Sequence, residues 1–161
     1  NIIATAKHFP GHGLVSGDTH KSLQVIDGEL KEIKHYPPLI KDSVLSIMIA
    51  HIAIKNNAKY DTDGMPATTS RKIVTGLLRD DFGFQGLIVT DAMNMGGVAK
   101  VKDASLLAIA AGCDIVLMPL NAAETHKKIL AKYAVSDDFK STVDESVKRI
   151  IRMKVCLGLI Q

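Results

Sequence analysis

The sequence has few cysteines, little net charge and no long apolar run. Its two cysteines, Cys113 and Cys156, lie far apart within apolar stretches, which indicates two small core residues and not a disulfide framework. The formal net charge is only +3, and basic residues are interspersed with acidic ones. The sequence therefore predicts neither a nucleic-acid-binding face nor a basic membrane-binding stripe. No apolar run approaches the roughly 20 residues of a membrane-spanning helix, so we expect no membrane span.

The composition is that of a folded domain. The 161 residues are 47% hydrophobic and 23% charged, which suits one domain, or a large part of one, with a buried core. The sequence begins at Asn1, without an initiator methionine, and enters an apolar stretch at once. We therefore expect the true beginning to be missing, and both a cytoplasmic and a periplasmic location remain open.

Strand and helix signals alternate along the chain. Four short runs rich in β-branched residues predict strands at 2–6, 45–50, 87–90 and 114–118. None of the four alternates between apolar and polar residues, which is typical of parallel strands that are covered on both faces. Amphipathic patterns predict helices at 71–83, 103–112, 122–133 and 141–159, the first capped by Thr69 or Ser70. This order predicts an α/β fold with a parallel sheet.

Polar residues follow the expected strands at their carboxyl ends. Lys7 and His8 follow the first strand, His51 the second and Asp91 the third. In a (β/α)₈ barrel this end of every strand carries the active site, although an open doubly wound sheet also binds ligands there. A whole barrel takes about 250 residues, so four strand-helix units in this length predict a partial TIM (β/α)₈ barrel, roughly its last four βα units.

A loop rich in histidine and glycine follows the first strand. It reads KHFPGHGLVSGDTH over residues 7–20, and in extended backbone the spacing of Asp18 and His20 places both side chains on one side. A carboxylate beside an imidazole fixes the ring's tautomer and favours its protonated form, as in a proton-transfer dyad. Two other interpretations are a solvated loop in which Asp18 caps a turn and a zinc site formed by His8, His12, Asp18 and His20.

The same loop resembles the signature loop of the β-N-acetylglucosaminidase branch of glycoside hydrolase family 3. In that branch Lys-His-Phe-Pro-Gly-His-Gly is followed, four residues later, by Asp-Ser/Thr-His, and this sequence has the same spacing. The resemblance implies that His20 is the general acid/base and Asp18 its partner, while Lys7 and His8 contact the sugar. His12 is expected to serve only the structure of the loop. We further expect the loop's glycines to let it fold over the sugar.

A second motif, GFQGLIVTDAMNMGGV at 83–98, resembles another hallmark of this family. By this resemblance Asp91 is the catalytic nucleophile; its alternative role is to cap the segment after the strand. Residues 66–84 also resemble the family, so that the similarity extends to about Pro119. His51 lies in an apolar run, where a lone histidine is more often a core residue than a catalytic one. Both His51 and Met93 could nevertheless line the pocket.

The resemblance implies a retaining β-N-acetylglucosaminidase. It would release terminal non-reducing N-acetylglucosamine from peptidoglycan fragments or related oligosaccharides through a covalent intermediate on Asp91, with no metal or organic cofactor. Residues 1–161 would then form the C-terminal part of one catalytic barrel, and the missing N-terminal half would complete the sugar site. The alternatives are an inactive sugar-binding fragment and a metal-dependent barrel hydrolase. Phosphate could also replace water as the acceptor.

Overall fold

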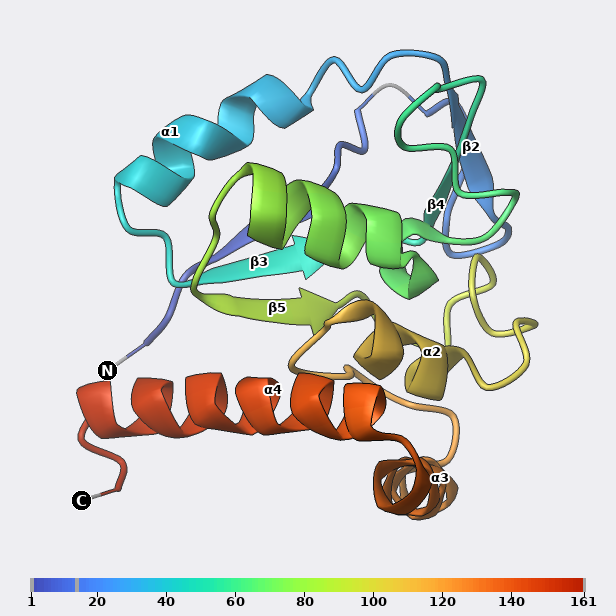
Figure 1. Ribbon diagram of the computed structural model, residues 1–161. Coiled ribbons are helices and arrows are strands. Elements are labelled where there is room, and N and C mark those ends of the chain that lie inside the picture. The colour runs from blue at the N-terminus through green and yellow to red at the C-terminus, as the bar shows by residue number, and fades with distance from the viewer. Residues whose placement is uncertain (1, 14, 161) are drawn as a thin grey trace.

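A parallel three-stranded sheet forms the centre of the protein. The computed structural model describes residues 2–13 and 15–160. Its sheet has the order β1-β3-β5, with β1 at Thr5–Phe9, β3 at Ser46–Ile49 and β5 at Leu87–Thr90 (Figure 1). Both pairings are parallel. The expected parallel α/β sheet is therefore confirmed, and within the described residues it remains open at both edges.

Two of the four predicted strands need correction. The first begins at Thr5 and not at residue 2, so that Lys7 and His8 lie within β1 and not beyond its end. The prediction of a strand at 114–118 is wrong, because this segment makes only a single bridge, between Ile115 and Val89 of β5. Met118 adopts a left-handed backbone conformation with φ of 48°, which ends any extended run at that residue.

A second, two-stranded sheet was not predicted. It pairs β2 (Gln24–Asp27) with β4 (Ile52–Lys55) in parallel. Only Ala50 and His51 separate β4 from β3, so one apolar run supplies strands to both sheets. The short helices η1 (Ile33–His35) and α1 (Tyr36–Lys41) connect β2 to β3.

The predicted helices are present, with shifted ends. The helix at 71–83 is the π-helix η3 (Lys72–Asp81), preceded by the 3₁₀ turn η2 (Ala67–Thr69). Neither Thr69 nor Ser70 caps η3 with its side chain, which corrects that expectation. The other helices are α2 (Ala104–Ala111), α3 (Ala122–Val135) and α4 (Asp137–Cys156). The last begins earlier than expected, because the Ser136 side chain accepts a hydrogen bond from the Phe139 amide and caps it there.

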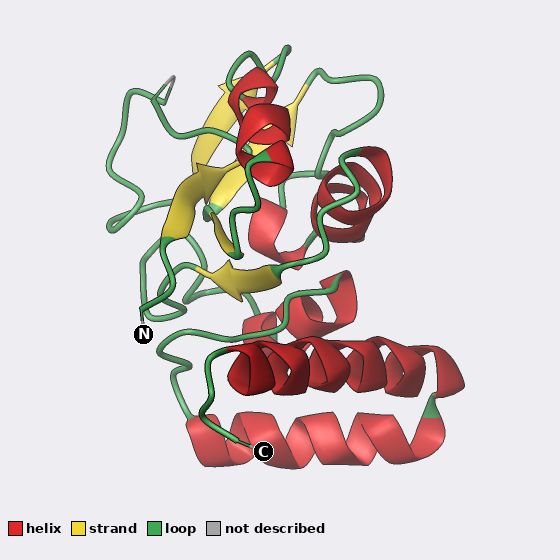
Figure 2. Ribbon diagram, turned by 90° about the vertical axis from the view of Figure 1, so that its left-hand side faces the viewer, coloured by secondary structure: helices red, strands yellow, loops and turns green. Residues whose placement is uncertain are grey.

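The core lies between η3 and the central sheet. Leu77 and Leu78 of η3 are buried as expected, and they belong to one cluster with Ile47 and Ile88 of the strands. Figure 2 shows α3 and α4 lying side by side on the far side of the molecule from the small sheet. The apolar face of α4 is only partly covered, and its three most exposed members are 46–50% exposed (Val147, Ile151 and Val155).

A buried carboxylate joins α4 to the sheet. Asp114 accepts hydrogen bonds from the Ile88 amide (2.7 Å) and from the guanidinium groups of Arg79 (2.6 Å) and Arg149 (2.9 Å). It also accepts one from the Ser146 hydroxyl, at 2.7 Å. The Asp114 side chain is 0% exposed, so these donors replace the water that its charge would otherwise bind.

The two cysteines differ in burial. Both are free; Cys113 is buried, as predicted for a core residue, whereas Cys156 is exposed, which corrects that expectation. Cys156 is the last residue of α4 and lines a cavity of about 410 Å³ together with Val44, Leu45 and Phe84. Among the described helices none is both long and apolar enough to cross a membrane.

Candidate active site

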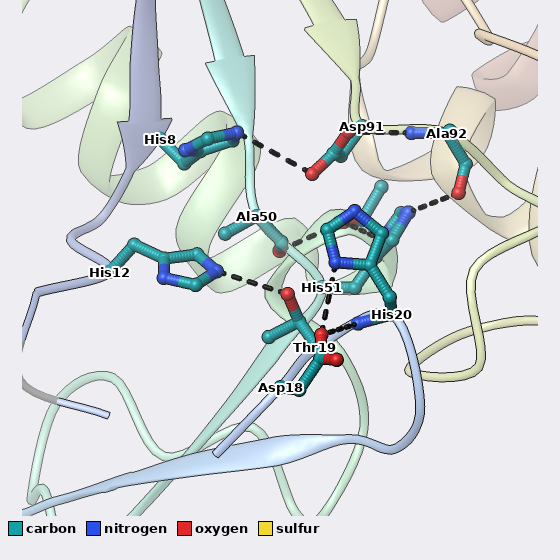
Figure 3. Close-up of polar contacts among 10 residues, drawn as sticks. His8, His12, Asp18, Thr19, His20, Ala50, His51, Asp91 and Ala92 are labelled. Carbon is teal, nitrogen blue, oxygen red and sulfur yellow. Dashed lines mark hydrogen bonds and ion pairs between the residues drawn. The ribbon is translucent and has the colours of Figure 1, made fainter. Parts of the chain in front are cut away.

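Asp91 lies at the carboxyl end of β5, next to His8 of β1. Its amide donates to the Ile49 carbonyl of β3 at 3.0 Å, which continues the sheet by one residue and fixes the backbone. One carboxylate oxygen, Oδ1, accepts a hydrogen bond from the Ala92 amide at 2.8 Å. The other, Oδ2, lies 3.6 Å from Nε2 of His8 (Figure 3). The Asp91 side chain is 17% exposed, so it is held firmly yet remains open to a ligand.

His8 remains neutral near neutral pH. Burial lowers its pKa below 6.5, and the positive charge of Lys7 acts in the same direction, whereas Asp91 opposes the shift. A neutral imidazole does not form a full ion pair with Asp91 and leaves the charge of Oδ2 available for chemistry. Lys7 itself is exposed on β1, beside a cavity of about 250 Å³ that His8, His12 and Glu32 also line.

Asp18 and His20 form the expected dyad. Oδ1 of Asp18 lies 3.0 Å from Nδ1 of the His20 ring and also accepts the His20 amide at 2.9 Å. These two contacts lower the pKa of Asp18 below 3.8 and keep it ionised. Because a carboxylate can only accept, Nδ1 carries a proton and Nε2 is the nitrogen that can exchange one. In Figure 3 the second ring nitrogen points away from Asp18.

The dyad and Asp91 come from distant parts of the chain that hydrogen bonds bring together. The Gly96 amide donates to the His20 carbonyl at 2.8 Å, and the Gly97 amide donates to the Thr19 carbonyl at 3.2 Å. The loop that carries the dyad thus rests on the segment that follows Asp91. Thr19, Gly96 and Gly97 were not predicted to hold the site together, although the adjacent glycines in the second motif were a visible signal.

His51 lies beneath the site. The residue is 1% exposed; Nε2 of its ring donates to the Ala92 carbonyl at 3.0 Å, and Nδ1 lies 2.8 Å from the Thr68 hydroxyl. Burial lowers the pKa of His51 below 6.5. The neutral ring therefore carries its proton on Nε2 and holds the residue next to Asp91 in place. Met93 is also buried, at 2% exposed, and its amide donates to the Leu117 carbonyl.

The loop before the dyad is packed against its neighbours. Nε2 of His12 lies 3.0 Å from the hydroxyl of Thr19, so that the two ends of the loop touch each other. The Gly13 amide donates to the Glu32 carboxylate at 3.0 Å. Thr19 belongs to the Asp-Thr-His motif, but the sequence predicted neither its contact with His12 nor that of Gly13 with Glu32, because only the folded loop brings these residues together.

The residues of the zinc interpretation do not converge. His8 faces Asp91, His12 faces Thr19, and His20 faces Asp18. In the part of the chain that the structure describes, no three histidine, cysteine, aspartate or glutamate side chains are grouped so that they could hold a metal ion. The geometry instead provides a carboxylate at a strand end and a carboxylate-imidazole pair beside it, the parts needed for acid/base-assisted displacement.

Comparisons with known proteins show the family to which the chain belongs. A family model described as the glycosyl hydrolase family 3 N-terminal domain matches residues 1–153. A β-N-acetylglucosaminidase/β-glucosidase of Cellulomonas fimi is 32% identical over 172 residues, 98% of this chain and 30% of the relative.

Two solved structures share the fold. The family 3 β-N-acetylglucosaminidase of Paenibacillus sp. FPU-7 has a TM-score of 0.84 and 28% identity, covering 95% of this chain and 31% of that one. The β-glucoside phosphorylase BglX bound to 2FGlc has a TM-score of 0.85 and 31% identity, covering 98% and 31%. The expected TIM-barrel-like α/β fold is thus confirmed, and this chain spans about a third of the length of these three proteins.

Proposed function

The chain belongs to glycosyl hydrolase family 3, in its β-N-acetylglucosaminidase branch, and from this we propose that it carries the catalytic residues of a retaining β-N-acetylglucosaminidase. The observation that carries the proposal is the docking of the Asp18–His20 loop on the segment after Asp91. A glycosidase needs one group to attack the anomeric carbon and another to move a proton at the glycosidic oxygen, and these side chains have those two chemistries.

The reaction proceeds in two displacements. Oδ2 of Asp91 attacks the anomeric carbon as the bond to the leaving oxygen breaks, while Nε2 of protonated His20 gives that oxygen its proton. His20 then takes a proton from a water molecule that attacks the same carbon and releases Asp91, so two inversions give net retention. The Ala92 amide, bound to Oδ1, stabilises the departing carboxylate, and Asp18 orients His20 in both steps.

The substrate is a saccharide that ends in N-acetylglucosamine, from peptidoglycan fragments or related oligosaccharides. The names of the relatives support the sugar, since two of them are β-N-acetylglucosaminidases. Lys7 and His8 are proposed to bind its hydroxyl groups. They lie at the rim of the site, one as an exposed cation and the other as a neutral imidazole that can donate or accept.

Phosphate is the second candidate acceptor. A relative with 31% identity is a β-glucoside phosphorylase, which supports this possibility. In the second displacement His20 and not a carboxylate would face the incoming phosphate, and an imidazole does not repel that anion. Adding inorganic phosphate to the reaction distinguishes the acceptors, because a phosphorylase forms N-acetylglucosamine 1-phosphate and a hydrolase forms the free sugar.

We further propose that these residues are the C-terminal part of one barrel and that the preceding half completes the sugar site. The three proteins compared are about three times as long. Beside β5, the segment that was expected to form the next strand leaves Ile115, Leu117 and Met118 36–55% exposed. A neighbouring strand would cover these side chains. Measurements of activity therefore need the product of the complete gene.

The first experiment compares that protein with its Asp91→Ala variant on 4-nitrophenyl β-N-acetylglucosaminide. Loss of nitrophenol release in Asp91→Ala, with full release in an Asp80→Ala control, supports the proposal, because Asp80 is an exposed aspartate of η3 away from the site. No release by the folded wild-type protein would leave the sugar-binding alternative. Activity that disappears with a chelator and returns with metal would support a metal-dependent hydrolase instead.

A further inference from the structure

Gly96 and Gly97 form main-chain hydrogen bonds with the loop that carries Asp18 and His20. Their amides donate to two consecutive carbonyls, those of His20 at 2.8 Å and Thr19 at 3.2 Å. Thr19 lies between the two members of the dyad and is only 3% exposed, whereas the side chains of Asp18 and His20 are 47% and 77% exposed. The loop is thus attached through main-chain atoms and the buried Thr19, which leaves the side chains of the dyad exposed.

The contact depends on the absence of side chains at both positions. A Cβ atom on Gly96 would overlap the Lys21 carbonyl oxygen and lie 2.8 Å from that of His20. A Cβ atom on Gly97 would lie 3.1 Å from the Thr19 carbonyl oxygen. These atoms belong to the backbone, so no side-chain rotation relieves the overlap, and the loop itself has to move away.

Gly13 and Gly17, within the loop, are different. A Cβ on Gly13 would meet the carboxylate end of Glu32, and a Cβ on Gly17 would meet the amide end of Gln24. Both are the far ends of flexible side chains that can turn aside. Compared with Gly13 and Gly17, Gly96 is the glycine at which a side chain would meet backbone atoms, and it lies outside the loop, in the segment that follows Asp91.

The opposite side of Thr19 is also held. Its hydroxyl lies 3.0 Å from Nε2 of His12, and the His12 ring packs against that of His8 at a centroid distance of 5.2 Å. These contacts connect His8 of β1, through His12, to Thr19 at the contact with Gly96 and Gly97. A displacement at this contact moves Asp18 and His20 together and leaves their mutual hydrogen bond intact.

We propose that Gly96 and Gly97 are positioning residues for general acid catalysis: they seat the Thr19–His20 backbone and so fix the distance between the His20 ring and Asp91. This inference rests on the proposed function, because it acts through the dyad and Asp91. In this role the two glycines do not contact the substrate. Their replacement is expected to weaken proton delivery to the leaving group while the nucleophile and the sugar contacts stay in place.

The test compares Gly96→Ala in the product of the complete gene with a Gly76→Ala control. Gly76 lies in η3, where a Cβ would meet only a backbone oxygen at an ordinary 3.8 Å. Two substrates are used: 4-nitrophenyl β-N-acetylglucosaminide, whose leaving group needs little protonation, and N,N′-diacetylchitobiose, whose sugar leaving group needs it fully. Turnover of Gly96→Ala should fall about 10- to 100-fold more on the disaccharide than on the aryl substrate, with little change in KM. Gly76→Ala should retain turnover on both.

If Gly96→Ala lost turnover equally on the two substrates, or lost none, the inference would be overturned. Activity of the wild-type protein would still support the proposed function in that case. An inactive wild-type protein would instead refute the proposed function. Amide hydrogen exchange tests the contact without any activity: the Gly96 and Gly97 amides should exchange much more slowly than that of the exposed Gly64. Equally fast exchange in the folded protein would overturn the inference, even if Gly96→Ala failed to fold.

Discussion

The two halves of the candidate site are built in opposite ways. Asp91 ends β5, whose four residues are all buried, and its amide remains in the sheet through the Ile49 carbonyl. Asp18 and His20 lie in an irregular loop with largely exposed side chains. Asp91 thus takes its position from the core of the fold, whereas Asp18 and His20 take theirs from a few contacts between loops.

Because of this difference, we expect mutations in the two halves to affect different properties of the protein. Displacing Asp91 requires disruption of the sheet or of the buried Asp114 cluster behind it, so damage there should appear as lost stability. Displacing the dyad requires only that the loop leave Gly96 and Gly97, which should alter the chemistry of a protein that remains folded. Four changes test this comparison, from the largest expected effect to the smallest.

Replacement of Asp91 by asparagine removes the nucleophile and keeps an oxygen for the Ala92 amide. Turnover should fall at least about 10³-fold on aryl and disaccharide substrates alike, because no other group described at the site can attack the anomeric carbon. The urea midpoint should stay unchanged. Azide added to Asp91→Ala should restore turnover and give the α-glycosyl azide, since azide enters from the nucleophile's face. Formation of the β-azide would place the nucleophile elsewhere.

Replacement of Asp114 by asparagine tests how much the buried charge cluster beside β5 contributes to stability. It leaves Arg79 and Arg149 with no full counter-charge in a buried place, which should cost about 3–5 kcal/mol of unfolding free energy. Urea denaturation measures this cost. The matched control Ser146→Ala removes one hydrogen bond to the same carboxylate and should cost only about 1 kcal/mol. Similar losses in the two variants would show that the charge of Asp114 contributes little.

Replacement of Asp18 by asparagine tests the loop side. Turnover of diacetylchitobiose should fall on the order of 10²-fold, with a smaller loss on the aryl substrate, because His20 loses the partner that holds its Nδ1 proton. Stability should not change, since Asp18 is half exposed. In the wild-type protein the lowered pKa of Asp18 keeps its carboxylate ionised to pH values below 3.8. A large drop in the urea midpoint of Asp18→Asn would contradict the assigned role.

Replacement of His51 by glutamine should change only the pH dependence of stability. Because burial lowers the pKa of His51 in the folded protein, the unfolded chain takes up its proton first as the pH falls below 6.5, and wild-type stability declines from there. Glutamine can bond the Ala92 carbonyl and Thr68 without titrating, so the decline between pH 7.5 and 5.5 should be shallower. His8 shifts in the same direction in both proteins. Parallel declines would mean that His51 contributes nothing to this dependence.

The sequence predicted those features that depend on local pattern. Four buried runs indicated a parallel α/β sheet, and two of them agree closely with β3 and β5. The Asp18–His20 spacing predicted the contact that the structure contains. The run at 114–118 was wrongly predicted as a strand, because its apolar character indicates burial but not a pairing partner. Among the described residues its only bridge is the one to Val89 of β5.

The sequence by itself thus determined the chemical groups of the site: a carboxylate that ends a strand and a carboxylate-imidazole pair on a glycine-rich loop. Only the tertiary structure decided how the two meet. The meeting depends on main-chain hydrogen bonds from Gly96 and Gly97 to His20 and Thr19, and on the buried His51 beneath them. Main-chain donors and acceptors are the same in every residue except proline, which lacks the donor. Two adjacent glycines therefore indicate where backbones can approach closely, but only the fold decides which carbonyls their amides meet.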